Sequence, residues 1–270
     1  MTSGLSARSV WREFETEGQP VLALQDISLD VGESEFVTIV GPSGCGKSTF
    51  LNITAGFLVP SRGELYLDDV PITGPGADRG MVFQEHALFP WMTVYRNIEY
   101  GLRIQRLAKP ERQQRVAHYL NLIGLENFAH FFPKDLSGGM KQRVAIARAL
   151  ACKPKMLLMD EPFAALDAQT RRFLQDELVR IWDETKTTIL FITHNIDEAL
   201  LLSDRVVVMT SRPGRIKECI KVDMARPRVE TDRRFIDYKI VITDLLKGEI
   251  AEALRQSGEL PGVGANTQGR

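Results

Sequence analysis

The stretch GPSGCGKST at residues 41–49 constrains the fold of this chain more than any other feature of its sequence. It fits the pattern G-x-x-x-x-G-K-[ST] and lies between an apolar run at 35–40 and a run of helical character that begins at residue 50. Glycines at these places let backbone N–H groups approach phosphate oxygens, and the start of a helix adds partial positive charge. The stretch therefore predicts a strand, a phosphate-binding loop (P-loop) and a helix, in that order.

The P-loop side chains have distinct expected roles. Lys47 is expected to reach the β- and γ-phosphates of a nucleotide, Ser48 to offer its hydroxyl to Mg²⁺, and Thr49 to bond the α-phosphate. The loop residues expected to contact the nucleotide are Gly41, Pro42, Ser43, Gly44, Cys45, Gly46, Lys47, Ser48 and Thr49. The alternative is a glycine-rich turn with no ligand, which the agreement of both flanking elements disfavours.

Composition narrows the class of protein. The formal net charge of −1 over 270 residues removes the broad basic field of a general nucleic-acid binder, so no nucleic-acid partner is expected. The cysteines Cys45, Cys152 and Cys219 lack paired spacing, and no run of 18 apolar residues occurs, which predicts a cytoplasmic chain without a membrane span. Cys45 precedes a helix start, so we expect its thiol pKa to be lowered.

The order of apolar runs indicates an α/β fold. Apolar runs lie at 35–40, 155–160, 187–193 and 205–209, and patterns typical of helices lie at 140–151 and 169–185. Continuous apolar runs are typical of strands that are buried on both faces, so we expect a parallel sheet of the P-loop NTPase (RecA-like) class.

Two further segments are expected to add to this core. Residues 21–31 alternate apolar and polar side chains before Gly32, which predicts an N-terminal antiparallel β subdomain, and 90–135 contain no strand pattern. We expect a single domain, with a core at 1–88 and 150–222, an inserted α-helical subdomain at 89–149, a C-terminal extension at 223–270 and a disordered tail at 261–270.

Paired carboxylates follow the run MLLMDEP at 156–162. Successive side chains on a strand point to opposite sides, so Asp160 can face Mg²⁺ while Glu161 faces an attacking water. A general base contributes roughly 10² to 10⁴ in rate, which favours a hydrolase over a nucleotide switch. The alternative is two solvated acids at the end of a strand.

Gln84 and His194 each follow a short apolar run and are candidate site residues at strand ends. In isolation each has a common alternative, because glutamine is usually a surface residue and histidine is often structural. His86, His118 and His130 show no metal-ligand spacing, so we interpret them as exposed or locally bonded.

A second glycine-rich helix start occurs in LSGGMKQR at 136–143. Ser137 can cap the helix, Gly138 and Gly139 leave backbone N–H groups uncovered, and Met140 stands where a capping box needs Glu or Gln. The first loop already encloses its phosphates. The second is therefore expected to bind the nucleotide of another copy, which makes ATP the link within a homodimer.

These stretches, in this order over residues 10–220, resemble the motifs of the ATP-binding cassette (ABC) ATPase family. The matches are GPSGCGKST to Walker A, Gln84 to the Q-loop, LSGGMKQR to the signature, MLLMDEP to Walker B, AALD with Asp167 to the D-loop, and His194 to the H-loop. The family's adenine-stacking aromatic is best matched by Phe14, with Trp11 nearby.

The resemblance implies ATP hydrolysis with Mg²⁺ and assigns roles to these positions. It implies that Glu161 acts as the base and that His194 contacts the γ-phosphate and orients Glu161, with Gln84 and Lys47 completing the catalytic set. Gln84 would link Mg²⁺ to the transport partner, so that Ser48, Gln84 and Asp160 form the metal set. Asp167 would lie at the dimer seam.

Three further stretches, at 84–98, 211–216 and 225–228, are similar to sequences of the nitrate/sulfonate/taurine importer subfamily. This resemblance implies a subunit that energises an ABC importer from the inner face of the membrane, with separate transmembrane permease subunits and, indirectly, a solute-binding protein. Phe89, Pro90 and Trp91 would then receive a helix of the permease, or they pack internally.

Two other classes of protein remain as alternatives. A soluble ABC ATPase of DNA repair or translation would act on nucleic acid or ribosomes, but those proteins carry long coiled coils or two fused cassettes. A P-loop kinase or GTPase does not explain the stretch at 136–143.

Overall fold

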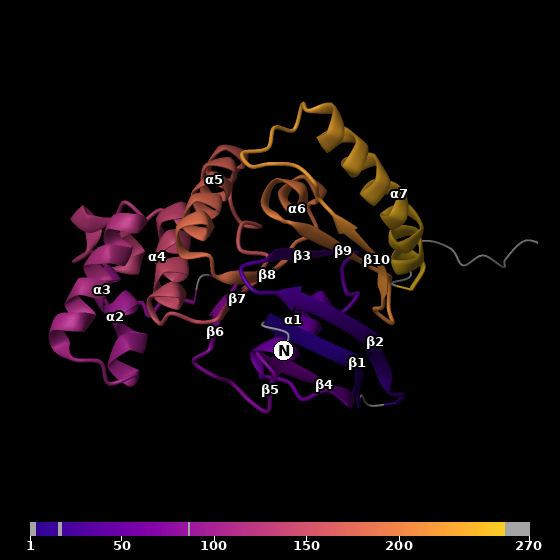
Figure 1. The fold of residues 1–270 in the computed structure, drawn as a ribbon, viewed down its shortest axis with the longest axis horizontal. Helices are drawn as coiled ribbons and strands as arrows, with labels where there is room; N and C mark the ends of the chain where they lie inside the picture. The colour runs from indigo at the N-terminus through magenta and orange to yellow at the C-terminus, as the bar shows by residue number, and fades with distance from the viewer. Residues whose placement is uncertain (1–3, 16–17, 86, 257–270) are drawn as a thin grey trace, which may run out of the picture.

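A six-stranded sheet forms the centre of the fold (Figure 1). The computed structural model describes residues 4–15, 18–85 and 87–256. The strand order is β10-β9-β3-β8-β7-β6, and the five strands from β9 to β6 run parallel while β10 pairs antiparallel with β9. The strands are β3 (Phe36–Val40), β6 (Arg79–Val82), β7 (Met156–Asp160), β8 (Thr188–Ile192), β9 (Arg205–Met209) and β10 (Ile216–Lys221). The predicted parallel α/β core is confirmed.

The continuous apolar runs are explained by burial on both faces of this sheet. Phe36 and Val40 of β3 belong to one hydrophobic core, and Val37 and Ile39 of the same strand belong to the other. Helices α5 (Ala168–Thr185) and α6 (Ile196–Leu202) cover the first face, and α1 (Lys47–Ala55) covers the second. Most residues of these strands therefore need apolar side chains, and the buried Thr38 of β3 is hydrogen-bonded to Ser203.

A four-stranded antiparallel sheet packs against the other side of α1 (Figure 1). Its order is β2-β1-β4-β5, with β1 (Gly4–Phe14), β2 (Val21–Gly32), β4 (Arg62–Leu67) and β5 (Val70–Pro71). The predicted N-terminal β subdomain is thus confirmed, although the sequence pattern indicated only the strand at 21–31. Side chains from both sheets and α1 share the second core.

The helical insertion lies beside the edge strand β6 (Figure 1). It contains α2 (Val94–Ile104), α3 (Lys109–Leu122), two short 3₁₀ turns (Glu126–Phe128 and Pro133–Asp135) and α4 (Gly138–Ala151). Residues 90–135 hold no strand, as expected. Asn97 is buried and joins the loop before α2 to that helix, because its amide group bonds Phe89 through both the N–H and the carbonyl oxygen.

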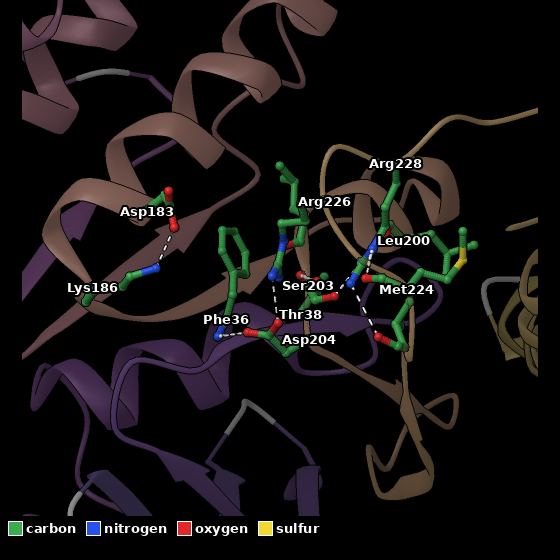
Figure 2. A network of polar contacts seen from close by, with 12 residues as sticks. Phe36, Thr38, Asp183, Lys186, Leu200, Ser203, Asp204, Met224, Arg226 and Arg228 are labelled. Atoms are coloured by element: carbon green, nitrogen blue, oxygen red, sulfur yellow. Dashed lines mark hydrogen bonds and ion pairs between the residues drawn. The ribbon is translucent and has the colours of Figure 1, made fainter. Parts of the chain in front are cut away.

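The described part of the C-terminal extension contains a long helix, α7 (Arg233–Gln256), which packs on α6 and β9. The segment between β10 and α7 is held in place by Arg228. The buried guanidinium of Arg228 donates to the carbonyls of Leu200, Ser203 and Met224 at 2.5–3.0 Å (Figure 2). Burial lowers the pKa of Arg228 to about 10, so the side chain remains charged at neutral pH.

Arg226 fastens the same segment through a salt bridge of 2.7 Å to Asp204, which also accepts from the backbone N–H of Phe36 on β3 (Figure 2). The extension is thereby tied to the helix that follows His194. In the described residues, no helix is both long and apolar enough to cross a membrane. The predictions for His86 and for a disordered tail at 261–270 lie outside the described residues.

Candidate nucleotide site

The P-loop runs between the end of β3 and the start of α1. Gly46 has φ of 103°, and a Cβ there would lie 2.6 Å from Leu24 Cδ2 and 2.9 Å from the Ala23 carbonyl oxygen. Gly44 also has a positive φ, of 74°. Both positions therefore need glycine, and no side chain caps the first turn of α1. The backbone N–H groups of this turn are left for an anion.

Lys47 is held ready at the loop. Its side chain is buried at 6% exposure, and Nζ donates to the carbonyl oxygens of Gly41 and Pro42, at 2.9 Å each. These bonds hold a cation beside the helix start, where a phosphate oxygen can replace one of the carbonyls.

The expectation for Cys45 is wrong. Its side chain is 1% exposed, and burial raises the pKa of the thiol, although the Lys47 ammonium acts in the opposite direction. The Cys45 side chain belongs to the core beneath α1, so desolvation of the thiolate outweighs the field of the helix start.

A cleft of about 490 Å³ opens above the loop. That volume is in the range of pockets for nucleotide-sized ligands. The residues that line it are Phe14, Val21, Ala23, Ser43, Gly44, Gly46, Lys47, Ser48, Thr49, Glu161 and Arg212. One end is apolar and comes from β1 and β2, whereas the other carries the P-loop.

Phe14, the last residue of β1, is the aromatic side chain of this cleft. It is half-buried, and the guanidinium carbon of Arg12 lies 4.6 Å from its ring centroid. Trp11 does not line the cleft and instead contacts Arg62. The sequence therefore selected the residue that the fold brings to the site.

Ser48 and Asp160 place a hydroxyl and a carboxylate oxygen side by side at the carboxyl end of the sheet. Ser48 Oγ donates to Asp160 Oδ1 over 3.0 Å, and burial raises the pKa of Asp160 while the Ser48 hydrogen bond acts against that rise. Hydroxyl and carboxylate oxygens are ligands that Mg²⁺ prefers, and a cation would offset the desolvation of the carboxylate. The residues present thus fit a magnesium ion.

Glu161 follows β7 directly in a left-handed backbone conformation, with φ of 43°. This conformation is uncommon outside glycine and is typical of residues constrained by function. Its Oε2 lies 3.0 Å from His194 Nδ1, and the two side chains are 23% and 64% exposed, respectively. The pair joins the ends of neighbouring strands β7 and β8 at the rim of the cleft.

Gln84 is exposed in the turn after β6 and does not line the cleft. Strands β6 and β7 are parallel, with Val82 opposite Met159, so Gln84 lies at the same sheet edge as Asp160. Gln84 is thus near Asp160 along the sheet, but no hydrogen bond joins the two side chains in the described part of the chain.

The second glycine-rich helix start lies on α4, away from the cleft. Ser137 Oγ caps the helix by accepting from the Met140 N–H over 3.3 Å, and Ser137 and Gly138 are exposed. Gly139 is buried, and a Cβ there would lie 2.8 Å from Thr170 Cγ2. None of these residues lines the cleft, so one chain alone does not bring the two helix starts together.

Asp167 and Leu166 lie beside this second helix start. Asp167 caps α5, because its Oδ1 accepts from the Thr170 N–H over 3.0 Å, and this backbone bond lowers the pKa of Asp167. A Cβ on Gly138 would lie 3.2 Å from Leu166 Cδ2. The predicted D-loop and signature residues are therefore neighbours within the chain.

The structure also adds residues that the sequence interpretation missed. Val21, Ala23 and Arg212 line the nucleotide cleft. A second cleft of about 520 Å³ lies between the P-loop and α7; its lining includes His194, Arg212, Leu246, Ile250, Ala253 and Leu254. The stretch 211–216 was noted only as a family detail, and α7 carried no motif that would place it here.

Comparisons with known proteins identify the family of this chain. A family model described as "ABC transporter" matches residues 24–164. The nitrate import ATP-binding protein NrtD of Synechocystis is 45% identical over 250 residues, which covers 89% of this chain and 94% of that protein. The taurine import ATP-binding protein TauB of Roseobacter denitrificans is 48% identical over 233 residues, with 86% and 87% covered.

Among solved structures, a dimeric ATP-binding cassette in a post-hydrolysis state, bound to ADP and Pi, is 33% identical with a TM-score of 0.71. The match covers 82% of this chain and 100% of that chain. The resemblance drawn from the motifs is confirmed: this chain belongs to the ABC transporter family, as a nucleotide-binding subunit with ATPase activity.

Proposed function

We propose that this chain energises an importer for a small anion such as nitrate, or for a sulfonate such as taurine. The proposed ATP hydrolysis is supported by one observation. Lys47, the Ser48–Asp160 pair and the Glu161–His194 pair lie together at one end of the sheet. The import part is supported by relatives named for nitrate and taurine import.

In this proposal each residue of the site has its own role in ATP hydrolysis. The P-loop N–H groups and Lys47 bind the phosphates, and Phe14 stacks on the adenine. Glu161 takes the proton of the attacking water, while His194 holds the Glu161 carboxylate and contacts the γ-phosphate. Mg²⁺, held by Ser48 and Asp160 with Gln84 nearby, would neutralise charge that develops on the phosphates.

We propose a homodimer that binds ATP at its seam. The exposed Ser137–Gly138 helix start of one copy would complete the site of the other, and Asp167 beside it would lie at the same seam. A dimeric cassette among the similar structures supports this arrangement. Hydrolysis would then remove the bridging γ-phosphate and let the copies separate.

The remaining partners follow from the importer proposal. Separate permease subunits would receive the chain at the inner face of the membrane, and a solute-binding protein would act indirectly.

The helical block 89–149 would form one subdomain against the core 1–88 and 150–222. The rings of the exposed Trp91 and the half-buried Phe89 lie 5.7 Å apart, tilted by 43°, and suit contact with a permease helix.

Glu161→Gln tests the catalytic proposal. The variant should retain ATP binding, lose at least about 99% of phosphate release and accumulate an ATP-bound dimer, because it lacks the base but keeps the phosphate contacts. Phosphate release and size-exclusion chromatography with Mg·ATP measure both effects. Glu33→Gln, an exposed acid in the turn after β2, is the matched control. Unimpaired hydrolysis by Glu161→Gln would contradict the role of the base.

The importer proposal has its own test. The chain should co-purify with permease subunits, and ATPase activity in proteoliposomes should rise when nitrate or taurine and a binding protein are supplied. A chain that stays free of membranes and binds RNA or DNA would instead support the nucleic-acid alternative.

A further inference from the structure

The turn between β9 and β10 contacts both walls of the nucleotide cleft. Gly214 N–H donates to the Ala23 carbonyl oxygen, and Gln25 N–H donates to the Gly214 carbonyl oxygen, at 2.9 Å each. A Cβ on Gly214 would lie 2.0 Å from the Cys45 carbonyl oxygen. The turn is therefore packed without a gap against β2 on one side and the P-loop on the other.

Arg212 extends from this turn to the P-loop. Its Nε and Nη2 both donate to the Gly44 carbonyl oxygen, over 3.4 Å each, and the side chain is exposed. Within the described part of the chain, Lys47 and Arg212 are the cationic side chains that line the cleft. Lys47 reaches it from beneath the loop, whereas Arg212 comes from the β9–β10 turn.

We propose that Arg212 binds the phosphate chain of the nucleotide as a second cation beside Lys47, an inference that rests on the proposed function. Gly44 belongs to the loop whose N–H groups hold the phosphates, so the guanidinium lies close to where the phosphate oxygens would be. A cationic side chain there can donate a charge-assisted hydrogen bond to a phosphate oxygen.

Stacking of Arg212 on the base fits the structure less well. The apolar end of the cleft already has a guanidinium, because Arg12 lies over the Phe14 ring at 4.6 Å. The hydrogen bonds of Arg212 lead to Gly44 on the P-loop instead. Its charge is thus directed at the polar end of the cleft.

The same turn supplies a matched control. Arg215 is also exposed, but its Nε donates to Gln25 Oε1 over 3.0 Å, and it does not line the cleft. Arg212→Gln and Arg215→Gln therefore remove the same charge from the same turn, at the cleft and away from it.

The test is the equilibrium Kd for ADP of the purified chain, measured by calorimetry at two salt concentrations. Arg212→Gln should raise the Kd about tenfold and weaken its dependence on salt, because a charged hydrogen bond to phosphate is lost. Arg215→Gln should stay within about twofold of the wild type. Equal Kd values for Arg212→Gln, Arg215→Gln and the wild type would overturn the proposal.

Arg212→Lys separates phosphate binding from support of the P-loop. Lysine keeps the charge, and it cannot reproduce the fork of two N–H groups on the Gly44 carbonyl. A Kd within about threefold of the wild type supports the phosphate contact. A Kd like that of Arg212→Gln shows that the residue only supports the loop. If wild-type protein binds no nucleotide, the proposed function fails, and this outcome is distinct from failure of the Arg212 proposal.

Discussion

Glu161 and His194 form a side-chain contact of 3.0 Å at the rim of the cleft. Glu161 is held in a left-handed conformation that costs roughly 1–3 kcal/mol, so the surrounding structure must fix it. Its backbone does so in part, since the Glu161 N–H donates to the Ile192 carbonyl oxygen over 3.0 Å. The histidine then restricts the carboxylate itself.

His194→Ala should lower kcat by about 10- to 100-fold while the Kd for ADP stays within about twofold, because the carboxylate loses its orientation and the P-loop is untouched. Steady-state phosphate release and ADP calorimetry measure the two effects. His118→Ala is the control, since His118 is an exposed histidine on α3. A variant with wild-type kcat would show that the 3.0 Å contact has no part in turnover.

The cysteines should differ in reactivity with iodoacetamide at pH 8. Cys219 is exposed and Cys45 is buried beneath the P-loop, so Cys219 should be alkylated at least about tenfold faster, although burial raises the pKa of both thiols. Mass spectrometry of digested samples measures the rates. In urea the difference should disappear, and equal rates in the native chain would show that Cys45 is accessible.

The motif residues Lys47, Ser48, Asp160, Glu161 and His194 lie together at one end of the sheet, because each follows a strand end or begins a helix whose direction the parallel sheet fixes. Arg212 could not be predicted in this way. Its place depends on how the β9–β10 turn packs on β2 and on the P-loop, and sequence spacing does not reveal that packing.

Helix α6 carries a buried acid one turn after His194. Glu198 Oε1 accepts from Gln175 Nε2 on α5 over 3.0 Å, and burial raises the pKa of Glu198 above its ordinary 4.5. The groups that face it are Thr193, His194 and Arg171, together with Gln175. The helix therefore holds a carboxyl whose ionisation the interior disfavours.

This pKa predicts a pH-dependent stability. At a pH below 4.5 both folded and unfolded chains bind the proton, and as pH rises toward the folded pKa only the unfolded chain releases it. Relative to Glu198→Gln, the wild type should therefore lose unfolding free energy between about pH 4 and pH 7. Urea unfolding of both chains at the two pH values tests this. A constant difference would show that the pKa of Glu198 does not change on folding.

The elements differ in how readily their sequences reveal them. Strands β3, β7, β8 and β9 were predicted because burial on both faces gives continuous apolar runs. Strand β1 was missed because register shifts and the left-handed Ser9, with φ of 45°, interrupt its alternation. Helix α7 was missed because a terminal extension carries no motif, although Phe235, Ile242 and Leu246 bury one of its faces.

In the whole molecule, the two glycine-rich helix starts lie on different parts of one chain, α1 in the core and α4 in the helical insertion. A site that uses both starts therefore needs two copies of the chain.

Ser137→Arg should leave the Kd for ADP within about twofold and abolish the ATP-dependent dimer of a Glu161→Gln background. The bulky arginine side chain would keep the partner's nucleotide away from the second helix start. Calorimetry and light scattering measure these effects.

The control for this change is Gln114→Arg, which places the same side chain on an exposed position of α3. It should dimerise like its parent. Loss of ADP binding in Ser137→Arg monomers would mean that the second helix start serves the nucleotide of its own chain.

The end of α7 lines the second cleft, of about 520 Å³, through Ile250, Ala253 and Leu254. P-loop residues and His194 line the same cleft. In a Cys219→Ser chain, an environment-sensitive dye on a cysteine introduced at Ala253 would therefore lie beside the P-loop and His194 without replacing any residue assigned to binding or hydrolysis. Position 253 is thus a suitable attachment point for an optical probe of changes at the P-loop.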